Sequence, residues 1–341
     1  MRTLITGGAG FIGANTADRL LAQGEEVIIL DNLSRPGSAM NLEWLRKKYA
    51  EFPFVLADVR DYPAVKRALA DHQPLDAVLH FAAQVAVTTS VERPREDFEV
   101  NALGTLNVLE AVRELESSAA VLYTSTNKVY GALEGVGVVE EGSRYKFKNL
   151  PRGVPETMPL DFYSPYGCSK GAADQYARDY HRIYGVRTVV FRNSCIYGPR
   201  QFGIEDQGWL AWFVIAAVTG RPITIYGDGR QVRDVLHVSD LIDVMLLAVQ
   251  RIDEVKGQVF NLGGGPQNSI AVWSELRPML ESMVGHELPV GYQPWRPGDQ
   301  KVYVSDISKA SRELGWAPKI DVADGLRSLL EWVMENRSLF A

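Results

Sequence analysis

The chain has 341 residues, 46% of them hydrophobic, and a formal net charge of −6. It is long enough for one large domain or two associated domains with a sizeable core, and its negative charge disfavours nonspecific binding to nucleic acid. Its two cysteines, Cys168 and Cys195, exclude a disulfide framework and a cysteine-based metal site, and no metal is predicted.

The longest apolar run, residues 210–218, falls far short of the roughly 20 residues needed to cross a bilayer. No secretory leader precedes the first predicted strand, which begins almost at Met1. We therefore expect a cytoplasmic protein that does not span a membrane.

Short apolar strands alternate with helical stretches in the first half of the chain. The predicted strands, in chain order, are residues 2–6, 25–31, 52–59, 76–83, 119–126 and 186–194. Their nearly continuous apolar character indicates strands that are covered on both faces, as in a parallel sheet between layers of helices. The sequence therefore predicts an α/β fold of the Rossmann type, with a doubly wound parallel sheet.

The pattern loosens after the sixth strand. Residues 198–209, 222–234 and 292–304 mix arginine, glycine and aromatic residues in a way that suits a substrate-capping domain. We expect a Rossmann domain over residues 1–192, completed by residues 234–255. A smaller C-terminal domain would comprise residues 193–233 and 256–341.

A glycine triplet directly follows the first predicted strand. Gly7, Gly10 and Gly13 open the next helix, where glycines allow a tight turn and a close approach of the backbone to a pyrophosphate. Asp31 ends the second strand, and an acid about 20 residues after the glycines hydrogen-bonds the adenosine ribose. The pattern predicts a dinucleotide site, and Asp31 favours NAD because a 2′-phosphate would face a carboxylate. Arg35 leaves NADP as an alternative, although we interpret it as a loop arginine over the adenine.

Tyr166 and Lys170 are four residues apart, on one face of a predicted helix. A free tyrosine has a pKa near ~10, too high for a base at neutral pH. A nearby ammonium and a cationic nicotinamide would lower that pKa by stabilising the phenolate.

Five motifs occur in the order typical of one enzyme family. They are TGGAGFIG (6–13), VYG (129–131), YGCSK (166–170), GDGRQVRD (227–234) and RPGD (296–299). Together they resemble the extended short-chain dehydrogenases/reductases, the NAD-dependent epimerases and dehydratases. The resemblance implies that Tyr166 is the acid/base, that Lys170 orients the nicotinamide ribose, and that Thr126 shares a proton with the sugar. It also places Asn101 near the cofactor.

The predicted cofactor site combines the glycine loop, the ends of neighbouring strands and the catalytic pair. The small residues after the strands are also consistent with tight helix–strand packing. The predicted residues are Gly7, Gly10, Phe11, Ile12, Gly13, Asp31, Asn32, Ser34, Arg35, Asp58, Val59, Phe81, Ala82, Ala83, Asn101, Thr124, Tyr166 and Lys170.

Asn127 and Lys128 stand where the sugar-nucleotide dehydratases of this family carry an Asp-Glu pair. Neither supplies the carboxyl groups that eliminate water, so dehydration is disfavoured. Five segments resemble the CDP-paratose (CDP-tyvelose) 2-epimerase subgroup, together with the long excursion around residues 140–149. They are residues 31–45, 84–90, 125–131, 164–176 and 201–213. That resemblance implies inversion of C2 of a CDP-hexose by transient oxidation, with NAD regenerated.

Two other functions stay open at this point. A 4-epimerase or a net oxidoreductase would use the same scaffold, and the sugar and the base are not fixed by spacing. A dinucleotide-sensing regulator is the third alternative, although the intact Thr126, Tyr166 and Lys170 count against it.

The predicted substrate site combines arginines suited to phosphate oxygens with residues from family positions. For each arginine, a structural salt bridge is the alternative. The predicted substrate-binding residues are Gln84, Ser125, Thr126, Asn127, Asn193, Gln207, Arg233, Arg296 and Asp299. The resemblance further implies a homodimer, with residues 102–116 and the helix through 170–185 pairing across a two-fold axis in a four-helix contact.

Overall fold

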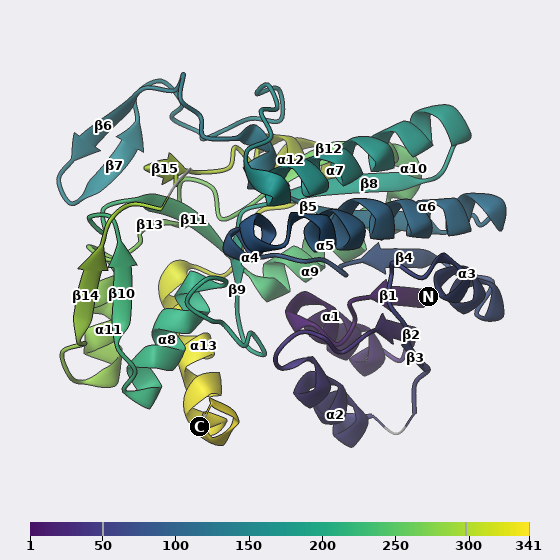
Figure 1. The fold of residues 1–341 in the computed structure, drawn as a ribbon, viewed down its shortest axis with the longest axis horizontal. Helices are drawn as coiled ribbons and strands as arrows, with labels where there is room; N and C mark the ends of the chain where they lie inside the picture. The colour runs from purple at the N-terminus through teal and green to yellow at the C-terminus, as the bar shows by residue number, and fades with distance from the viewer. Residues whose placement is uncertain (50, 297–298, 341) are drawn as a thin grey trace. The chain divides into compact units, whose positions relative to one another are not determined.

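The computed structural model describes residues 1–49, 51–296 and 299–340. The chain divides into two compact units (Figure 1). Unit 1 comprises residues 1–129, 164–192 and 242–260, and unit 2 comprises residues 130–163, 193–241 and 261–341. Residues 130–163, which we had included in the predicted Rossmann domain, thus group with unit 2.

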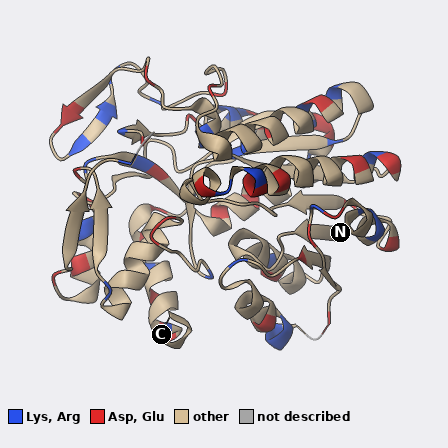
Figure 2. Ribbon diagram, in the orientation of Figure 1, with Lys and Arg blue, Asp and Glu red and all other residues tan. Residues whose placement is uncertain are grey.

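A seven-stranded sheet forms the centre of unit 1, in the order β12-β8-β5-β4-β1-β2-β3. Its strands are β1 (Arg2–Thr6), β2 (Glu26–Asp31), β3 (Phe54–Leu56), β4 (Ala77–His80), β5 (Ala120–Thr126), β8 (Thr188–Asn193) and β12 (Val259–Leu262). The pairs that β1 forms with β2 and β4 are parallel, with Leu4 opposite Ile28 and Val78. Few charged residues fall on these strands (Figure 2). The predicted parallel α/β sheet is confirmed.

Helices cover both faces of this sheet. The helices before the catalytic segment are α1 (Phe11–Ala22), α2 (Ser38–Lys48), α3 (Tyr62–Asp71), α4 (Val87–Glu92), α5 (Pro94–Phe98) and α6 (Gly104–Glu114). They are followed by α7 (Ser164–Tyr184), α9 (Val238–Gln250) and α10 (Ile252–Val255). Buried side chains of α3, α6 and α7 pack on one face of the sheet. On α1 and α9, Arg19 and Asp243 form an ion pair of 2.7 Å.

A π-turn, Glu99–Leu103, joins α5 and α6 into one continuous helical stretch. The N–H of Gly104 donates to the carbonyl of Glu99, five residues earlier. Such wide turns inside helices are rare and often accompany functional sites. This one carries Asn101.

Unit 2 contains three smaller groups of strands. A four-stranded sheet contains β9 (Cys195–Tyr197), β11 (Val232–His237), β13 (Ser269–Ala271) and β15 (Val302–Tyr303), while β10 (Ile223–Tyr226) pairs with β14 (Val290–Gln293) and β6 (Val138–Glu141) with β7 (Arg144–Phe147). The other elements are α8 (Trp209–Thr219), α11 (Leu276–Val284), α12 (Ser308–Leu314) and α13 (Val322–Glu335), with a short turn at Arg337–Phe340. Another short turn, Asn127–Tyr130, follows β5 where the chain passes from unit 1 to unit 2.

Helix α8 contains the longest apolar run of the sequence. Its side chains pack with those of α11 and α13 in the hydrophobic core of unit 2. A helix that is apolar all round belongs in such an interior. Among the described residues, no helix is long and apolar enough to cross a membrane.

The excursion around residues 140–149 forms the β6–β7 hairpin, which side chains fix to the rest of unit 2. The hydroxyl of Tyr145 donates to Asp228 at 2.6 Å, and the guanidinium of Arg230 lies 3.2 Å from the carboxylate of Glu140. Asp228 and Arg230 both lie in the GDGR loop, so the hairpin and this loop are held together.

Candidate active site

The turn between β1 and α1 requires glycine at two positions. Gly7 has φ +67°, and a Cβ there would lie 2.6 Å from the backbone nitrogen of Ala82. A Cβ on Gly13 would lie 2.2 Å from the carbonyl oxygen of Gly7. Phe11 and Ile12 open α1, whose N-cap residue, Gly10, makes no side-chain cap. The N–H groups of this helix start therefore remain available to an anion such as a pyrophosphate.

Asp31 ties the end of β2 to the glycine loop. Its carboxylate accepts hydrogen bonds from the backbone N–H groups of Ala9, at 3.0 Å, and Leu33, at 2.8 Å. Burial raises the pKa of Asp31, and these backbone donors oppose that rise. Asp31 and the glycine turn are thus held together by hydrogen bonds, an arrangement that fits the predicted site for the adenosine half of NAD.

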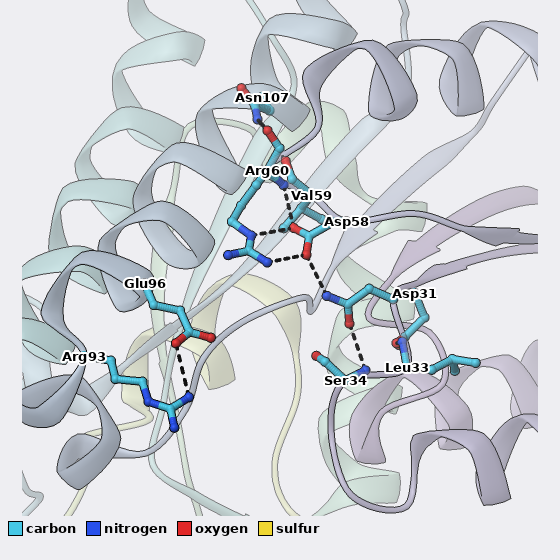
Figure 3. Close-up of polar contacts among 10 residues, drawn as sticks. Asp31, Leu33, Ser34, Asp58, Val59, Arg60, Arg93, Glu96 and Asn107 are labelled. Atoms are coloured by element: carbon cyan, nitrogen blue, oxygen red, sulfur yellow. Dashed lines mark hydrogen bonds and ion pairs between the residues drawn. The ribbon is translucent and has the colours of Figure 1, made fainter.

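The loops after β2 and β3 meet at Asp58 (Figure 3). Arg60 donates to both carboxylate oxygens of Asp58, from Nε at 2.9 Å and from Nη2 at 2.8 Å, and the side-chain amide of Asn32 donates at 2.8 Å. The hydrogen bonds from Arg60 lower the pKa of Asp58 to about 2. Asn32 in turn accepts from the N–H of Ser34 at 3.0 Å. The structure therefore brings together three residues that the sequence assigns to the cofactor.

Two side chains of this region were not predicted from the sequence. Arg60 holds Asp58 in place, and Asn107 on α6 donates to the carbonyl oxygen of Val59 at 2.8 Å (Figure 3). The spacing of Asp58 and Arg60, two residues apart at a strand end, is the available signal for the first. Nothing local in the sequence identifies the second, because α6 reaches Val59 only in the fold.

Asn101 and Gln84 use their amides inside the protein. The Nδ2 of Asn101 donates to the carbonyl of Gln84 at 3.0 Å and to the hydroxyl of Ser169 at 3.1 Å. The Nε2 of Gln84 donates to the carbonyl of Ala86 and to Asp97. Both amides are buried. A substrate contact by Gln84 stays a prediction, one that these hydrogen bonds do not support.

The predicted catalytic residues come from the end of β5 and the start of α7. Thr126 is the last residue of β5, and its hydroxyl hydrogen-bonds the phenol of Tyr166 on α7. One helical turn further, the Nζ of Lys170 donates to the carbonyl of Thr124 at 2.6 Å and lies 4.4 Å from the ring centroid of Tyr123. The structure thus brings Thr126, Tyr166 and Lys170 together in unit 1.

Burial shifts both titratable groups of this site. It raises the pKa of Tyr166 to about 12, although the hydrogen bond from Thr126 and the guanidinium of Arg35 oppose the rise. It lowers the pKa of Lys170 to about 7, against the attraction of Asp97 and Asp174. We had expected a lowered pKa for Tyr166, but among the groups of this chain burial has the larger effect. The guanidinium of Arg35 lowers the pKa of Tyr166. The predicted position of Arg35 over the adenine stays a prediction.

Ser125 faces the interior between β5 and α7. Its hydroxyl donates to Asp174 at 2.8 Å, and the same carboxylate receives two hydrogen bonds from Arg192, at 2.8 and 2.9 Å. All three side chains are buried. The predicted substrate contact of Ser125 is therefore not supported by its hydrogen bonding.

Both predicted substrate-binding arginines of unit 2 form ion pairs with carboxylates. Arg233 donates to Asp299 at 2.6 Å, and Arg296 donates to Asp206 at 2.9 Å. The guanidinium of Arg296 also lies 3.8 Å from the ring centroid of Tyr226. The side-chain oxygen of Asn193 is buried without a hydrogen-bond partner.

A buried, unpaired amide oxygen is costly, so Asn193 is well placed to receive a ligand. Gln207 forms a backbone bridge with Ile204 just before α8. A contact of Gln207 with substrate stays a prediction.

Comparison with known proteins places this chain among epimerases and dehydratases of nucleotide sugars. Residues 4–329 match the family model described as GDP-mannose 4,6 dehydratase. The chain is 46% identical to a CDP-paratose 2-epimerase from Salmonella typhi, over 97% of this chain and 99% of that protein. It is 34% identical to a dTDP-glucose 4,6-dehydratase from Xanthomonas campestris, over 98% of this chain and 93% of that protein.

A solved structure supports the cofactor assignment. The UDP-glucose 4-epimerase from Thermus thermophilus, in complex with NAD, resembles this chain with a TM-score of 0.79 and 34% identity, covering 97% of this chain and 98% of that one. The predicted NAD cofactor and the predicted isomerase class are confirmed. The chain thus belongs to the GDP-mannose 4,6-dehydratase family of NAD-dependent epimerases and dehydratases, and it is an NAD-dependent isomerase.

Proposed function

We propose that the protein inverts C2 of the hexose in a CDP-hexose of the CDP-paratose or CDP-tyvelose type. The observation that carries this proposal is the 46% identity, over nearly the full length, to a CDP-paratose 2-epimerase. The dehydratase relative is less similar, at 34% identity.

The turn after Thr126 supports epimerisation over dehydration. Asn127 follows Thr126 directly, and its side-chain oxygen accepts a hydrogen bond from the Thr126 hydroxyl at 3.3 Å. The next residue is Lys128. Neither residue is a carboxylic acid or a carboxylate, the groups that would assist the loss of water from a sugar.

The proposed mechanism uses the groups of unit 1 for proton transfer. Bound NAD supplies the chemistry that this chain lacks, accepting a hydride from the sugar carbinol and returning it. Tyr166 takes the proton of the C2 hydroxyl, Thr126 holds that oxygen and the phenol in one hydrogen-bonded line, and Lys170 orients the nicotinamide ribose. Stabilising the phenolate requires further cationic neighbours, because the pKa of Tyr166, raised chiefly by burial, is about 12 even with Arg35 nearby.

Residues of unit 2 would anchor the nucleotide. We propose that Arg233 and Arg296 bind the diphosphate, that Asn193 contacts the diphosphate-sugar, and that Asp299 binds the nucleotide ribose. The unpaired side-chain oxygen of Asn193 is a hydrogen-bond acceptor, which suits a hydroxyl of the ligand. Guanidinium groups match phosphate oxygens in geometry. An anchored diphosphate would let the oxidised sugar turn and present its other face.

A screen of sugar nucleotides tests the proposal. CDP-, UDP-, GDP- and dTDP-hexoses are incubated with the enzyme, and the products are identified by NMR while NADH is followed by absorbance. We expect a C2-inverted CDP-hexose with no net NADH. A C4-inverted product would favour a 4-epimerase, the activity named for the UDP-glucose 4-epimerase relative from Mycolicibacterium smegmatis, 35% identical over 99% of this chain. Accumulating NADH would indicate a dehydrogenase.

A further inference from the structure

Asp97, on α5, is a buried carboxylate that the mechanism above does not use. Its side chain is 1% exposed. One oxygen accepts from the hydroxyl of Ser169 at 2.5 Å, and the other accepts from the amides of Gln84, at 2.9 Å, and Asn101, at 3.1 Å. Burying a carboxylate is costly unless the surroundings use its charge, so this position calls for a role.

No arginine or lysine forms an ion pair with Asp97 in the described part of the chain, where all of its donors are neutral. The other buried carboxylate near the catalytic helix, Asp174, differs in this respect. Arg192 pairs with Asp174 through two hydrogen bonds, which compensates its charge. Asp97 is therefore a buried carboxylate on this side of α7 with only neutral hydrogen-bond donors among the described residues.

The charge of Asp97 acts on the catalytic pair through Ser169. That residue lies between Tyr166 and Lys170 in the sequence, and its hydroxyl is also 3.2 Å from the carbonyl oxygen of Tyr166. Asp97 raises the pKa of Lys170 and also that of Tyr166. In a buried site these interactions are weakly screened.

The other titratable groups around the pair do not replace this charge. Burial lowers the pKa of His80 to about 3, which keeps its ring neutral at pH 7. Burial raises the pKa of Tyr123, which keeps that phenol neutral. Arg35 is cationic and lowers the pKa of Tyr166.

We propose that Asp97 is a positioning residue for catalysis: its buried carboxylate holds the start of α7 through Ser169 and keeps Lys170 in its ammonium form. The pKa of Lys170, about 7, already includes the attraction of Asp97. Without that attraction the pKa of Lys170 would fall further, which favours the neutral amine, a form that cannot stabilise a phenolate. The proposal rests on the roles assigned to Tyr166 and Lys170 and does not depend on the identity of the sugar.

The substitution Asp97→Asn isolates the charge. The oxygen of an asparagine still accepts from Gln84 and Asn101, and its amide donates to Ser169, whose hydroxyl proton then turns to the carbonyl of Tyr166. The variant and the wild type, both loaded with NAD, are labelled with 13C at the ε carbon of lysine and titrated by NMR. The Lys170 signal is assigned by its absence in Lys170→Arg.

We expect the titration midpoint of Lys170 in Asp97→Asn to fall by about one pH unit. Asp97→Glu retains the charge and should restore the midpoint. Ser169→Ala removes a hydrogen bond without removing charge, so its midpoint should stay near the wild-type value while turnover falls. Asp18→Asn, which removes a carboxylate on α1 that pairs with Lys48, serves as the matched control and should leave the midpoint unchanged.

An unchanged Lys170 midpoint in Asp97→Asn would overturn the proposal and leave Asp97 a purely structural residue. If that variant does not fold, Asp97→Ser replaces it, because serine leaves space for water at the position of the carboxylate. A lowered Lys170 midpoint in Asp97→Ser would support the proposal, and an unchanged midpoint would overturn it. Because the titration needs no substrate, its result is independent of whether the sugar proposed above is correct.

Discussion

At the scale of single residues, Tyr166 and Thr126 carry separable parts of the proton transfer. Tyr166→Phe should lower turnover by ~10²–10⁴-fold, the usual contribution of a general acid–base group, while NAD binding stays close to wild type because the ring still packs. Thr126→Val should cost less, because it removes only a hydrogen-bond partner of the phenol. Steady-state rates and the NAD content of the purified variants are the measurements. Turnover of Tyr166→Phe within a few-fold of wild type would place the base on another residue.

His80 gives the protein a measurable dependence of stability on pH. Burial lowers its pKa from 6.5 to about 3. The unfolded chain therefore binds a proton that the folded chain does not, and stability falls as the pH drops from about 6.5 toward about 3, by up to about 1.4 kcal/mol per pH unit. Urea midpoints at pH 7.5 and pH 5 should differ less in His80→Gln than in the wild type.

The exposed His286 provides the control for this experiment. His286→Gln should keep the wild-type pH dependence. If His80→Gln keeps it too, another group, such as His237, whose pKa burial lowers to about 4, accounts for the effect.

At the scale of elements, Arg60 links the loops that follow β2 and β3 by fixing Asp58. Arg60→Met should leave Asp58 without its cationic partner and weaken NAD binding by about 3- to 10-fold, a modest factor because charge pairs with solvent access contribute little. Isothermal titration of NAD into cofactor-stripped protein measures this. Arg93→Met, which removes another pair near this loop (Figure 3), is the control and should bind NAD as the wild type does.

Strands could be predicted from the sequence where they are long enough to give a recognisable apolar pattern. Strands β1, β2, β3, β4, β5 and β8 lie within or match the predicted ranges, because the strands of a covered parallel sheet are almost continuously apolar. Strand β12 was not predicted, since its four residues, VFNL, give too short a pattern.

Side-chain direction explains the remaining differences at the site. Ser125 lies between Thr124 and Thr126 on β5, and alternate residues of a strand point to opposite faces. Its hydroxyl reaches Asp174, a partner 49 residues away in the sequence. Gln84 and Asp97 are likewise joined only by tertiary structure, so no local pattern could have identified their network.

At the scale of the whole molecule, the exposed face of α7 is a candidate surface for contact between two copies of the chain. Tyr176, Ile183 and Tyr184 are large apolar or aromatic residues that are about half exposed or more, at 49%, 65% and 54%. Exposed apolar groups of this kind often mark contacts between proteins. We propose a homodimer in which α6 and α7 of the two copies pair.

Ile183→Asp tests this proposal, because a carboxylate buried at the contact would be costly. Light scattering should give a dimer for the wild type at micromolar concentration and a monomer for the variant, with each variant chain still folded by circular dichroism. A wild-type monomer at that concentration would refute the dimer.

Isotope labelling of the substrate tests the proposed transfer of hydride from C2 and back in the complete enzyme. If C2 is oxidised and reduced again, a CDP-hexose deuterated at C2 should turn over with the label retained there. NMR of the product in ordinary water reads both the label and the configuration. Solvent hydrogen at C2 would exclude direct hydride return, and an inverted C4 with an unchanged C2 would exclude the proposed specificity.

The π-turn at Glu99–Leu103 has a consequence for the ways in which this chain can vary. In a regular α-helix, positions four apart drift around the axis by about 40° per step, so Asp97, Asn101 and Thr105 would spread away from one face. The wide turn offsets part of that drift, and all three side chains are buried. If the same residues formed a regular helix, Asp97 and Thr105, eight positions apart, would differ by about 80° around the helix axis. The wide turn therefore helps to keep Asp97 directed at Ser169 on α7, and substitutions that favour a regular helix at Glu99–Leu103 should weaken that contact.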